Sequence, residues 1–253
     1  MRILKNILFL FLTGLTLHAF SADPFFPGRR GDLSNKRVRN FRTRITIAPL
    51  INFYKINKNH ATTPSQKMSG LISVKEEVRL NQSHNMFLSL GAEYMIHGMN
   101  FNSYYFRPDT IRLYNGEMNY AYSLYIHELD FPLQLRISFN RENNAQYSPY
   151  MAMAYHLRVL LQGDLKVKQD GNVIEKKPEK ITFRNPLLNE KCNPFVSLTL
   201  GIQKNNPDKN KMGFFAELSF RYGFSPYLLK DDFTASSLYI TGHHLNLGLG
   251  IRL

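Results

Sequence analysis

The sequence predicts an all-β protein, specifically an eight-stranded antiparallel up-and-down transmembrane β-barrel. From Leu245 to Leu253 every odd position holds a large aliphatic residue, and every even position is polar or glycine. A period of two indicates a β-strand with one apolar and one polar face. Seven further segments alternate in the same way, and the connections between the segments are short and long in turn. An even number of such strands with this rhythm is typical of outer-membrane barrels.

Residues 1–21 have the features of a secretory signal peptide. Arg2 and Lys5 supply a positive start, an apolar core follows, and Ala19-Phe20-Ser21 matches a cleavage site. The apolar core is too short to cross a bilayer as a helix. We therefore expect export, with the mature chain beginning near Ala22.

Residues 22–42 are expected to form a basic periplasmic N-terminal segment. The whole chain carries a net charge of +13, and loss of Arg2 and Lys5 with the signal peptide leaves +11. Export excludes nucleic acid as the expected partner of this excess charge. Outer-membrane lipid and lipopolysaccharide offer anionic groups instead, although a solvated basic linker without a specific partner is the favoured interpretation of residues 23–42.

Residues 43–253 are expected to form the barrel. Its predicted strands are 43–56, 67–80, 86–99, 122–139, 147–166, 193–203, 213–227 and 241–253. Most exceed the ~9–11 residues that a tilted strand needs to cross a bilayer.

Each predicted strand has an apolar face made of alternate residues. In chain order these faces begin with Ile45, Ile72, Leu88, Leu129, Met151, Val196, Phe214 and Leu245. The opposite faces carry polar residues or glycine, such as Glu93, Asp130, Arg158, Gln162, Thr199 and Arg221.

The connections fall into two length classes. The short ones are 81–85, 140–146 and 204–212, and the long ones are 57–66, 100–121, 167–192 and 228–240. Short turns on the periplasmic side and long loops outside are usual in outer-membrane barrels. We therefore expect both termini in the periplasm.

Alternation alone does not say whether the apolar face meets lipid or a soluble core, because a lipocalin-like barrel also alternates. The polar faces carry charges of both signs, at Glu93, Glu128, Asp130, Arg136, Arg158, Glu217, Arg221 and Arg252. Aromatic residues gather near predicted strand ends, as interfacial girdles do; they are Tyr104, Tyr105, Phe106, Tyr120, Tyr122, Tyr147, Tyr227 and Tyr239. Both features favour a barrel with its apolar face toward lipid.

The inward charges are expected to form a plug of salt bridges, because small barrels fill their lumen with side chains. An ion path or a proton-transfer pair is the alternative for the same residues. We expect no catalytic, cofactor-binding or metal-binding residues. His243 and His244 point to opposite faces of one strand, and Cys192 is the sole cysteine.

A lipid A-modifying hydrolase is the enzyme class to be weighed. Barrels of that kind carry a His-x-Ser pair on one strand, and no histidine here has serine two positions later. A nucleophile and a base can still meet across strands. The expectation is a non-enzymatic protein, with the hydrolase as a less favoured alternative.

Several motifs resemble the PorT-type outer-membrane β-barrel family of Bacteroidota. They are His127-Glu-Leu-Asp-Phe-Pro-Leu-Gln-Leu-Arg136, Ser148-Pro-Tyr-Met-Ala-Met-Ala154, Phe215-Ala-Glu-Leu-Ser-Phe-Arg-Tyr-Gly223 and the terminal Leu-Gly-Leu-Gly-Ile-Arg-Leu. Ala154 stands where the family pattern usually has glycine. The motifs describe strand packing, so the resemblance implies a fold and assigns no functional residue. Some members of the family assist type IX secretion or gliding.

The sequence thus predicts a bacterial outer-membrane protein with a structural or accessory role. Its partners would bind at the outer loops, chiefly 100–121 and 167–192, or at the N-terminal segment. The last strand resembles the signal that barrel assembly machinery recognises, although it ends in Leu253 rather than phenylalanine. An accessory role in a type IX-like secretion or gliding assembly is the alternative.

Overall fold

The computed structural model describes ten parts of the chain: residues 41–56, 64–80, 85–105, 118–139, 146–169, 171–177, 181–183, 191–204, 212–229 and 238–253. The predicted signal peptide and most of the basic segment 22–42 lie outside these residues. No helix in the described part of the chain is long and apolar enough to cross a membrane.

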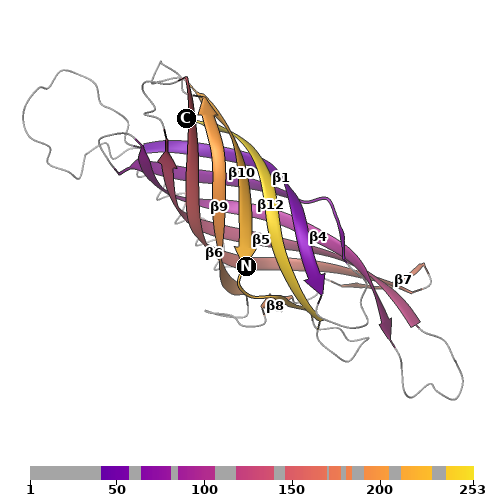
Figure 1. Cartoon of the computed structure of the whole chain (residues 1–253). Coiled ribbons are helices and arrows are strands. Elements are labelled where there is room, and N and C mark those ends of the chain that lie inside the picture. Colours follow the sequence, from indigo (N-terminus) through magenta and orange to yellow (C-terminus); the bar gives the residue numbers. More distant parts are fainter. Residues whose placement is uncertain are drawn as a thin grey trace, which may run out of the picture. The chain divides into compact units, whose positions relative to one another are not determined.

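Eight long strands form a closed antiparallel barrel, which confirms the predicted fold class. They are β1 (Phe41–Ile56), β3 (Gly70–Arg79), β4 (Met86–Tyr105), β5 (Met118–Ser138), β6 (Tyr147–Gln169), β9 (Cys192–Lys204), β10 (Gly213–Gly223) and β12 (Leu238–Arg252). Each pairs with the next along the chain, and β1 pairs with β12 from Arg44↔Arg252 to Ile56↔Ile240. Figure 1 shows these first and last strands side by side. The predicted closing role of the terminal strand is therefore confirmed.

Four short strands, among the described residues, extend the sheet at the end of the barrel reached by the long connections. They are β2 (Ser65–Gln66), β7 (Asn172–Lys177), β8 (Thr182–Phe183) and β11 (Tyr227–Leu229). β2 pairs with β4, β7 with β6, and β11 with both β12 and β8. We call this end of the barrel the long-connection end and the opposite end, where β1 begins and β12 stops, the terminal end.

Several strands are longer than the sequence predicted, whereas β3 and β10 are shorter than the predicted ranges 67–80 and 213–227. β4 runs on to Tyr105, β5 starts at Met118 and β6 ends at Gln169, so much of the predicted loops 100–121 and 167–192 is strand. β1 also begins at Phe41, two residues before the predicted boundary at 43. The predicted strand ends were too early because the prediction required each strand to have an apolar face toward lipid. Beyond the bilayer the pairing continues, and apolar residues such as Tyr122 and Val167 turn inward instead.

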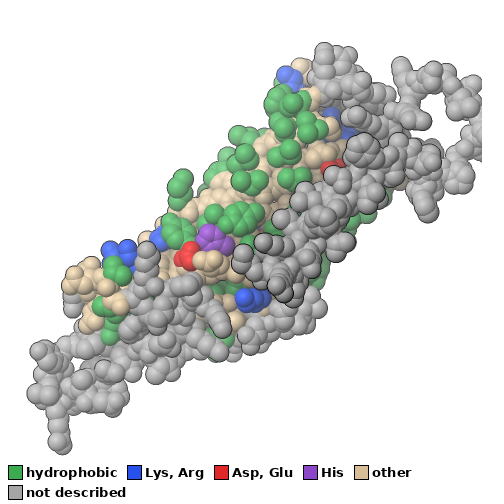
Figure 2. Space-filling model, turned by 180° about the vertical axis from the view of Figure 1, so that it is seen from behind, with side chains coloured by type: hydrophobic (Ala, Val, Ile, Leu, Met, Phe, Trp, Pro, Cys, Tyr) green, Lys and Arg blue, Asp and Glu red, His purple; other side chains and the backbone are tan. Residues whose placement is uncertain are grey.

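The outer wall of the barrel is apolar, as predicted. In β12, the side chains of Leu247 and Leu249 are 56% and 63% exposed, whereas Asn246, the residue before Leu247, faces the lumen and is 3% exposed. The same pattern holds in each long strand, and Figure 2 shows hydrophobic side chains gathered along the barrel wall. A continuous apolar wall around a polar interior fits a lipid bilayer.

A β-bulge changes the direction of the side chains in the upper part of β6. Glu128 pairs with Leu160 and His127 with Gln162, so Leu161 is an extra residue in β6. A bulge of this kind shifts the alternation by one position. Gln162, predicted on the inward polar face, is therefore exposed on the outer wall.

Candidate functional site

The lumen holds ten buried charged side chains among the described residues, five acidic and five basic. They are Glu77, Glu93, Glu128, Asp130 and Glu217, together with Arg44, Lys75, Arg136, Arg158 and Arg221. The predicted inward charges are all present except Arg252, which is only half-buried at the terminal end. Arg44 was not among the predicted inward charges, although it lies between the outward Thr43 and Ile45 and therefore occupies an inward position.

A terminal cluster joins the charges nearest the terminal end: Arg44, Glu77, Arg136, Tyr150 and Glu217. Arg136 binds Glu77 through two parallel contacts, Nε–Oε1 at 2.8 Å and Nη2–Oε2 at 3.1 Å. Arg44 donates to the Tyr150 hydroxyl at 2.8 Å, and Tyr150 donates to Glu217 at 2.9 Å. The Arg136 guanidinium lies 4.0 Å from the centroid of the Phe87 ring, and the Arg44 guanidinium lies 3.8 Å from the centroid of the Phe215 ring. These contacts compensate the loss of hydration of each charge.

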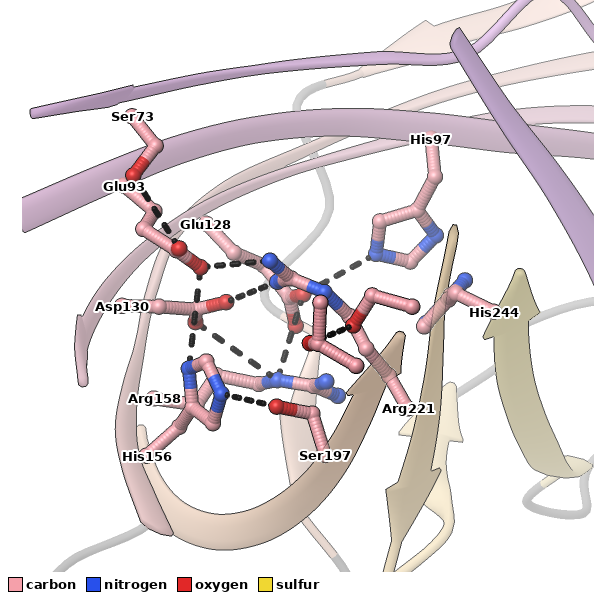
Figure 3. A network of polar contacts seen from close by, with 12 residues as sticks. Ser73, Glu93, His97, Glu128, Asp130, His156, Arg158, Ser197, Arg221 and His244 are labelled. Atoms are coloured by element: carbon pink, nitrogen blue, oxygen red, sulfur yellow. Dashed lines mark hydrogen bonds and ion pairs between the residues drawn. The ribbon is translucent and has the colours of Figure 1, made fainter. Parts of the chain in front are cut away.

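A central cluster joins the charges halfway along the barrel: Lys75, Glu93, Glu128, Asp130, Arg158 and Arg221. Figure 3 labels the last five of these residues. Arg221 bridges two carboxylates, with Nη2 2.5 Å from Glu93 and Nη1 3.2 Å from Asp130. Arg158 Nε lies 3.3 Å from Glu128 and 3.8 Å from Asp130. Lys75 Nζ contacts Glu93 at 2.9 Å. Acidic and basic groups thus alternate across the lumen.

Histidine and tyrosine side chains border the central cluster on the side of the long connections. His97 Nε2 lies 3.1 Å from Glu128, and Tyr227 donates to the same carboxylate at 2.9 Å. The Tyr54 hydroxyl shares a hydrogen bond with His97 Nδ1 at 2.5 Å. His244 faces His97, with ring centroids 4.8 Å apart. The polar interior ends at this layer.

Above this layer the lumen is filled by an apolar lumen cluster. Its buried members are Met99, Phe101, Tyr120, Tyr122, Leu124, Ile126, Leu160, Leu165, Val167, Ile181, Phe183, Tyr227, Leu229, Leu238 and Ile240. Ile181, just before β8, and Phe183, within β8, are 1% and 2% exposed, so this segment contributes two side chains to the apolar lumen cluster. Tyr120, Tyr122 and Tyr227 were predicted in an interfacial girdle, and that prediction is wrong. The extended strands place these tyrosines in the lumen, whereas Tyr147 remains on the outside.

A serine, a histidine and a glutamate lie in the order found in hydrolases. His156 Nε2 is 2.8 Å from Ser197 Oγ, and His156 Nδ1 is 3.6 Å from Glu93 Oε2. These residues come from three strands, so no spacing along the sequence could have revealed them. Yet all three are at least 95% buried, Glu93 is bound by Arg221 and Lys75, and His156 stacks on Phe195 at 4.1 Å between ring centroids. The arrangement has the distances of a nucleophile and its base without an approach for a substrate.

Glu93, Asp130 and His156 also bring three possible metal ligands within 4.8 Å of one another. Arg221 binds both carboxylates of this group, and Lys75 and Arg158 contact one each. A divalent cation would have to displace these basic groups against their repulsion. The arrangement therefore fits an ion-pair network better than a metal centre.

The other residues considered from the sequence lie apart. His243 is on the outer wall, stacked on Tyr222 with ring centroids 4.6 Å apart, whereas His244 is in the lumen. The predicted separation of these two histidines is confirmed. Cys192 is half-buried at the start of β9 and has a free thiol.

No family model and no curated protein matches the chain. Among solved structures, it is similar to the outer membrane protein OprG from Pseudomonas aeruginosa, with a TM-score of 0.51 and 10% identity over 84% of this chain and 95% of that one. Lower similarity links it to the outer membrane protease OmpT from Escherichia coli, with a TM-score of 0.47 and 9% identity over 85% and 97%. Neisserial surface protein A follows with 0.37 and 10% over 85% and 96%. The chain thus has the fold of an outer-membrane β-barrel.

Proposed function

We propose that this chain is a non-enzymatic protein of the bacterial outer membrane whose closed barrel has a structural or accessory role. The observation that supports this is the filling of the lumen along its length. The terminal and central clusters occupy one part, and the apolar lumen cluster occupies the rest. Neither part offers an ion a hydrated path. In the charged part the side chains are paired with one another, and the apolar part has no charged groups that could replace the water around an ion.

A closed lumen leaves the outer surfaces as the place where the protein acts. The wall faces lipid, so protein partners are expected at the long-connection end. There β7 carries two exposed apolar side chains, Val173 and Ile174, at 49% and 41%. The predicted loop tips near residues 106–117 lie outside the described residues. Barrel assembly machinery remains the expected partner of β12 during insertion.

The test is partner recovery from native membranes, with the full-length protein compared with a variant whose residues 106–117 are replaced by a short Gly-Ser turn. Both proteins should fractionate with outer membranes and show heat-modifiable migration on gels. The variant should lose its partners. Recovery of the unmodified protein in the soluble periplasm would contradict the proposal.

An accessory role in a type IX-like secretion or gliding assembly is a narrower form of the same proposal. Its support is the resemblance of the strand motifs and the basic segment 22–42, which carries Arg29, Arg30, Lys36, Arg37, Arg39 and Arg42. Deleting residues 24–38 behind an intact cleavage site should abolish co-purification with assembly components while leaving the barrel folded. Unchanged co-purification would count against this form.

A lipid hydrolase is the second candidate, favoured by the 2.8 Å contact between His156 and Ser197. An active hydrolase would be labelled by a fluorophosphonate probe at Ser197, and S197A would abolish labelling. Its overexpression would alter the mass spectrum of lipid A. The closed-barrel proposal predicts no labelling and an unchanged spectrum.

A further inference from the structure

The outer wall over β4, β5 and β6 has an ordered sequence of side chains toward the long-connection end. Leu133 and Leu129 belong to the apolar wall of β5. The next outward positions on β5 are His127, Tyr125 and Ser123, one above the other. The wall therefore changes from apolar to aromatic and then to polar over a few residues of one strand.

Lys67, which follows β2, reaches across β4 to this part of the wall. Its Nζ donates to the Ser123 hydroxyl at 2.5 Å and lies 3.7 Å from the centroid of the Tyr125 ring. Gly98 lies in β4 beside Tyr125, and a side chain there would collide with the Tyr125 ring and the Leu124 carbonyl. The glycine thus leaves room for Tyr125 and for the ammonium group above it.

Lys166 lies next to Ser123 on the other side, because the two residues pair in the register of β5 and β6. Partial burial, together with the charge of Lys166, lowers the pKa of Lys67. No acidic side chain in the described parts of the chain forms an ion pair with either lysine. The neighbouring Asp164 contacts His127 at 3.4 Å and Gln162 at 2.5 Å instead. Two positive charges therefore lie next to one hydroxyl on the outer wall. No acidic side chain among the described residues is paired with them.

Below this pair, Tyr94 and His127 are joined by a hydrogen bond of 2.8 Å, and their rings are 6.2 Å apart. Aromatic and histidine side chains with a polar tip suit the border between acyl chains and headgroups. A lipid that rests its acyl chains on the apolar wall would bring its headgroup to the level of Lys67 and Lys166. Two ammonium groups and a hydroxyl are suited to a phosphate.

We infer that Lys67, Ser123 and Lys166 form a binding site for the phosphate of an outer-leaflet glycolipid headgroup. The occupant is a lipid, because the site continues into the apolar wall through Tyr125 and His127. The inference rests on the proposed placement in the outer membrane with the long-connection end outward. It goes beyond the proposed function in naming a site and the chemistry of its ligand.

The test uses the full mature protein refolded in detergent micelles, with binding of fluorescent bisphosphorylated lipid A measured by titration. The variant is K67Q/K166Q, and the matched control is K55Q, which removes an exposed lysine of β1 at the same end of the barrel. We expect the double variant to bind lipid A at least about tenfold more weakly, because it removes both ammonium groups beside the Ser123 hydroxyl that would bind the phosphate. K55Q should bind like the unmodified protein. Heat-modifiable migration of all three proteins shows that they are folded.

Two further ligands separate the possible sources of phosphate. Dephosphorylated lipid A should bind the unmodified protein as weakly as bisphosphorylated lipid A binds the double variant. Millimolar inorganic phosphate should leave lipid A binding unchanged. Equal binding by K67Q/K166Q and K55Q, equal binding of dephosphorylated lipid A, or displacement by inorganic phosphate would each overturn the inference. Membrane fractionation tests the placement separately, so a misplaced protein and a missing site give different results.

Discussion

The two parts of the lumen are built on the same alternating strands and are filled in different ways. Toward the terminal end, five acids and five bases occupy the inward positions, and each carboxylate has its own set of basic or hydroxyl partners. Toward the long-connection end the same strands turn methionine, leucine, isoleucine and aromatic side chains inward. The β-bulge at Leu161 lies between the two parts on β6. Hence one closed barrel combines a polar interior suited to a bilayer with an apolar core like that of a soluble domain.

The two parts of the lumen are stabilised by different interactions. In the charged part, lipid surrounds the wall, and burial of charge is tolerated only because the partners are fixed. In the apolar part, the extended strands gain stability from their own interior, as water-soluble sheets do. The charged part should therefore be sensitive to the loss of a single partner, and the apolar part to the loss of packed volume.

The largest effect is expected from Arg221→Leu in the central cluster. It leaves Glu93 with one fewer partner and Asp130 with only the 3.8 Å contact to Arg158. Removing one member of a buried ion pair typically destabilises by about 3–5 kcal/mol. Urea unfolding in lipid vesicles, followed by circular dichroism, measures the change. Lys204→Leu, at an exposed position of β9, is the control and should change stability little.

A triple variant tests whether the uncompensated carboxylates cause this loss. Arg221→Leu combined with Glu93→Gln and Asp130→Asn removes the uncompensated charges together and should recover part of the lost stability. If Arg221→Leu unfolds at the same urea concentration as the unmodified protein, the charged part is not held by its ion pairs.

The next largest effect is expected from Leu238→Ala in the apolar lumen cluster. Leu238 is fully buried, and a leucine-to-alanine change at such a site costs about 2–5 kcal/mol, because it leaves a cavity in addition to losing apolar contact. The control is Leu249→Ala on the same strand, where the side chain is 63% exposed on the outer wall. Lipid refills that space, so the loss should be smaller. The same unfolding assay compares the two, and an equal loss would show that the upper lumen is not a packed core.

A smaller effect is expected from Gly201→Ala, which lies next to Tyr150 of the terminal cluster. A methyl group there would overlap the ring of Tyr150, whose hydroxyl links Arg44 to Glu217. Overpacking of this kind costs about 1–3 kcal/mol. Combining Gly201→Ala with Tyr150→Ala should remove the clash, so that the added methyl group costs less than it does alone. Thermal shift on gels is a sufficient measurement, and an unaffected Gly201→Ala would mean that Tyr150 is free to move.

The charged part of the barrel was easier to predict from the sequence than the apolar part. The strands within the bilayer were predictable, because lipid on one side and charges on the other leave a strict period of two, as at Leu245–Arg252. Residues such as Phe101 and Tyr122 break no alternation. They reverse which face is apolar, and nothing in a single strand states where that reversal occurs.

The pairing of side chains across strands was even less predictable. His156 meets Ser197, and Arg44 meets Tyr150, only because the register of the closed sheet brings them together. Lys67 reaches Ser123 because Gly98 lies between them, a relation between three separate segments. The Leu161 bulge moved Gln162 to the outer wall by a shift of one residue that the sequence pattern does not mark.

Single-channel recording in planar lipid bilayers tests whether the lumen is closed to ions. The refolded mature protein should insert and give no stable conductance steps, with an open porin as the positive control for insertion and current. A protein with the terminal cluster, the central cluster and the apolar lumen cluster in place should remain silent over physiological voltages. Stable, ion-selective steps from the unmodified protein would contradict the claim and assign the inward charges to an ion path.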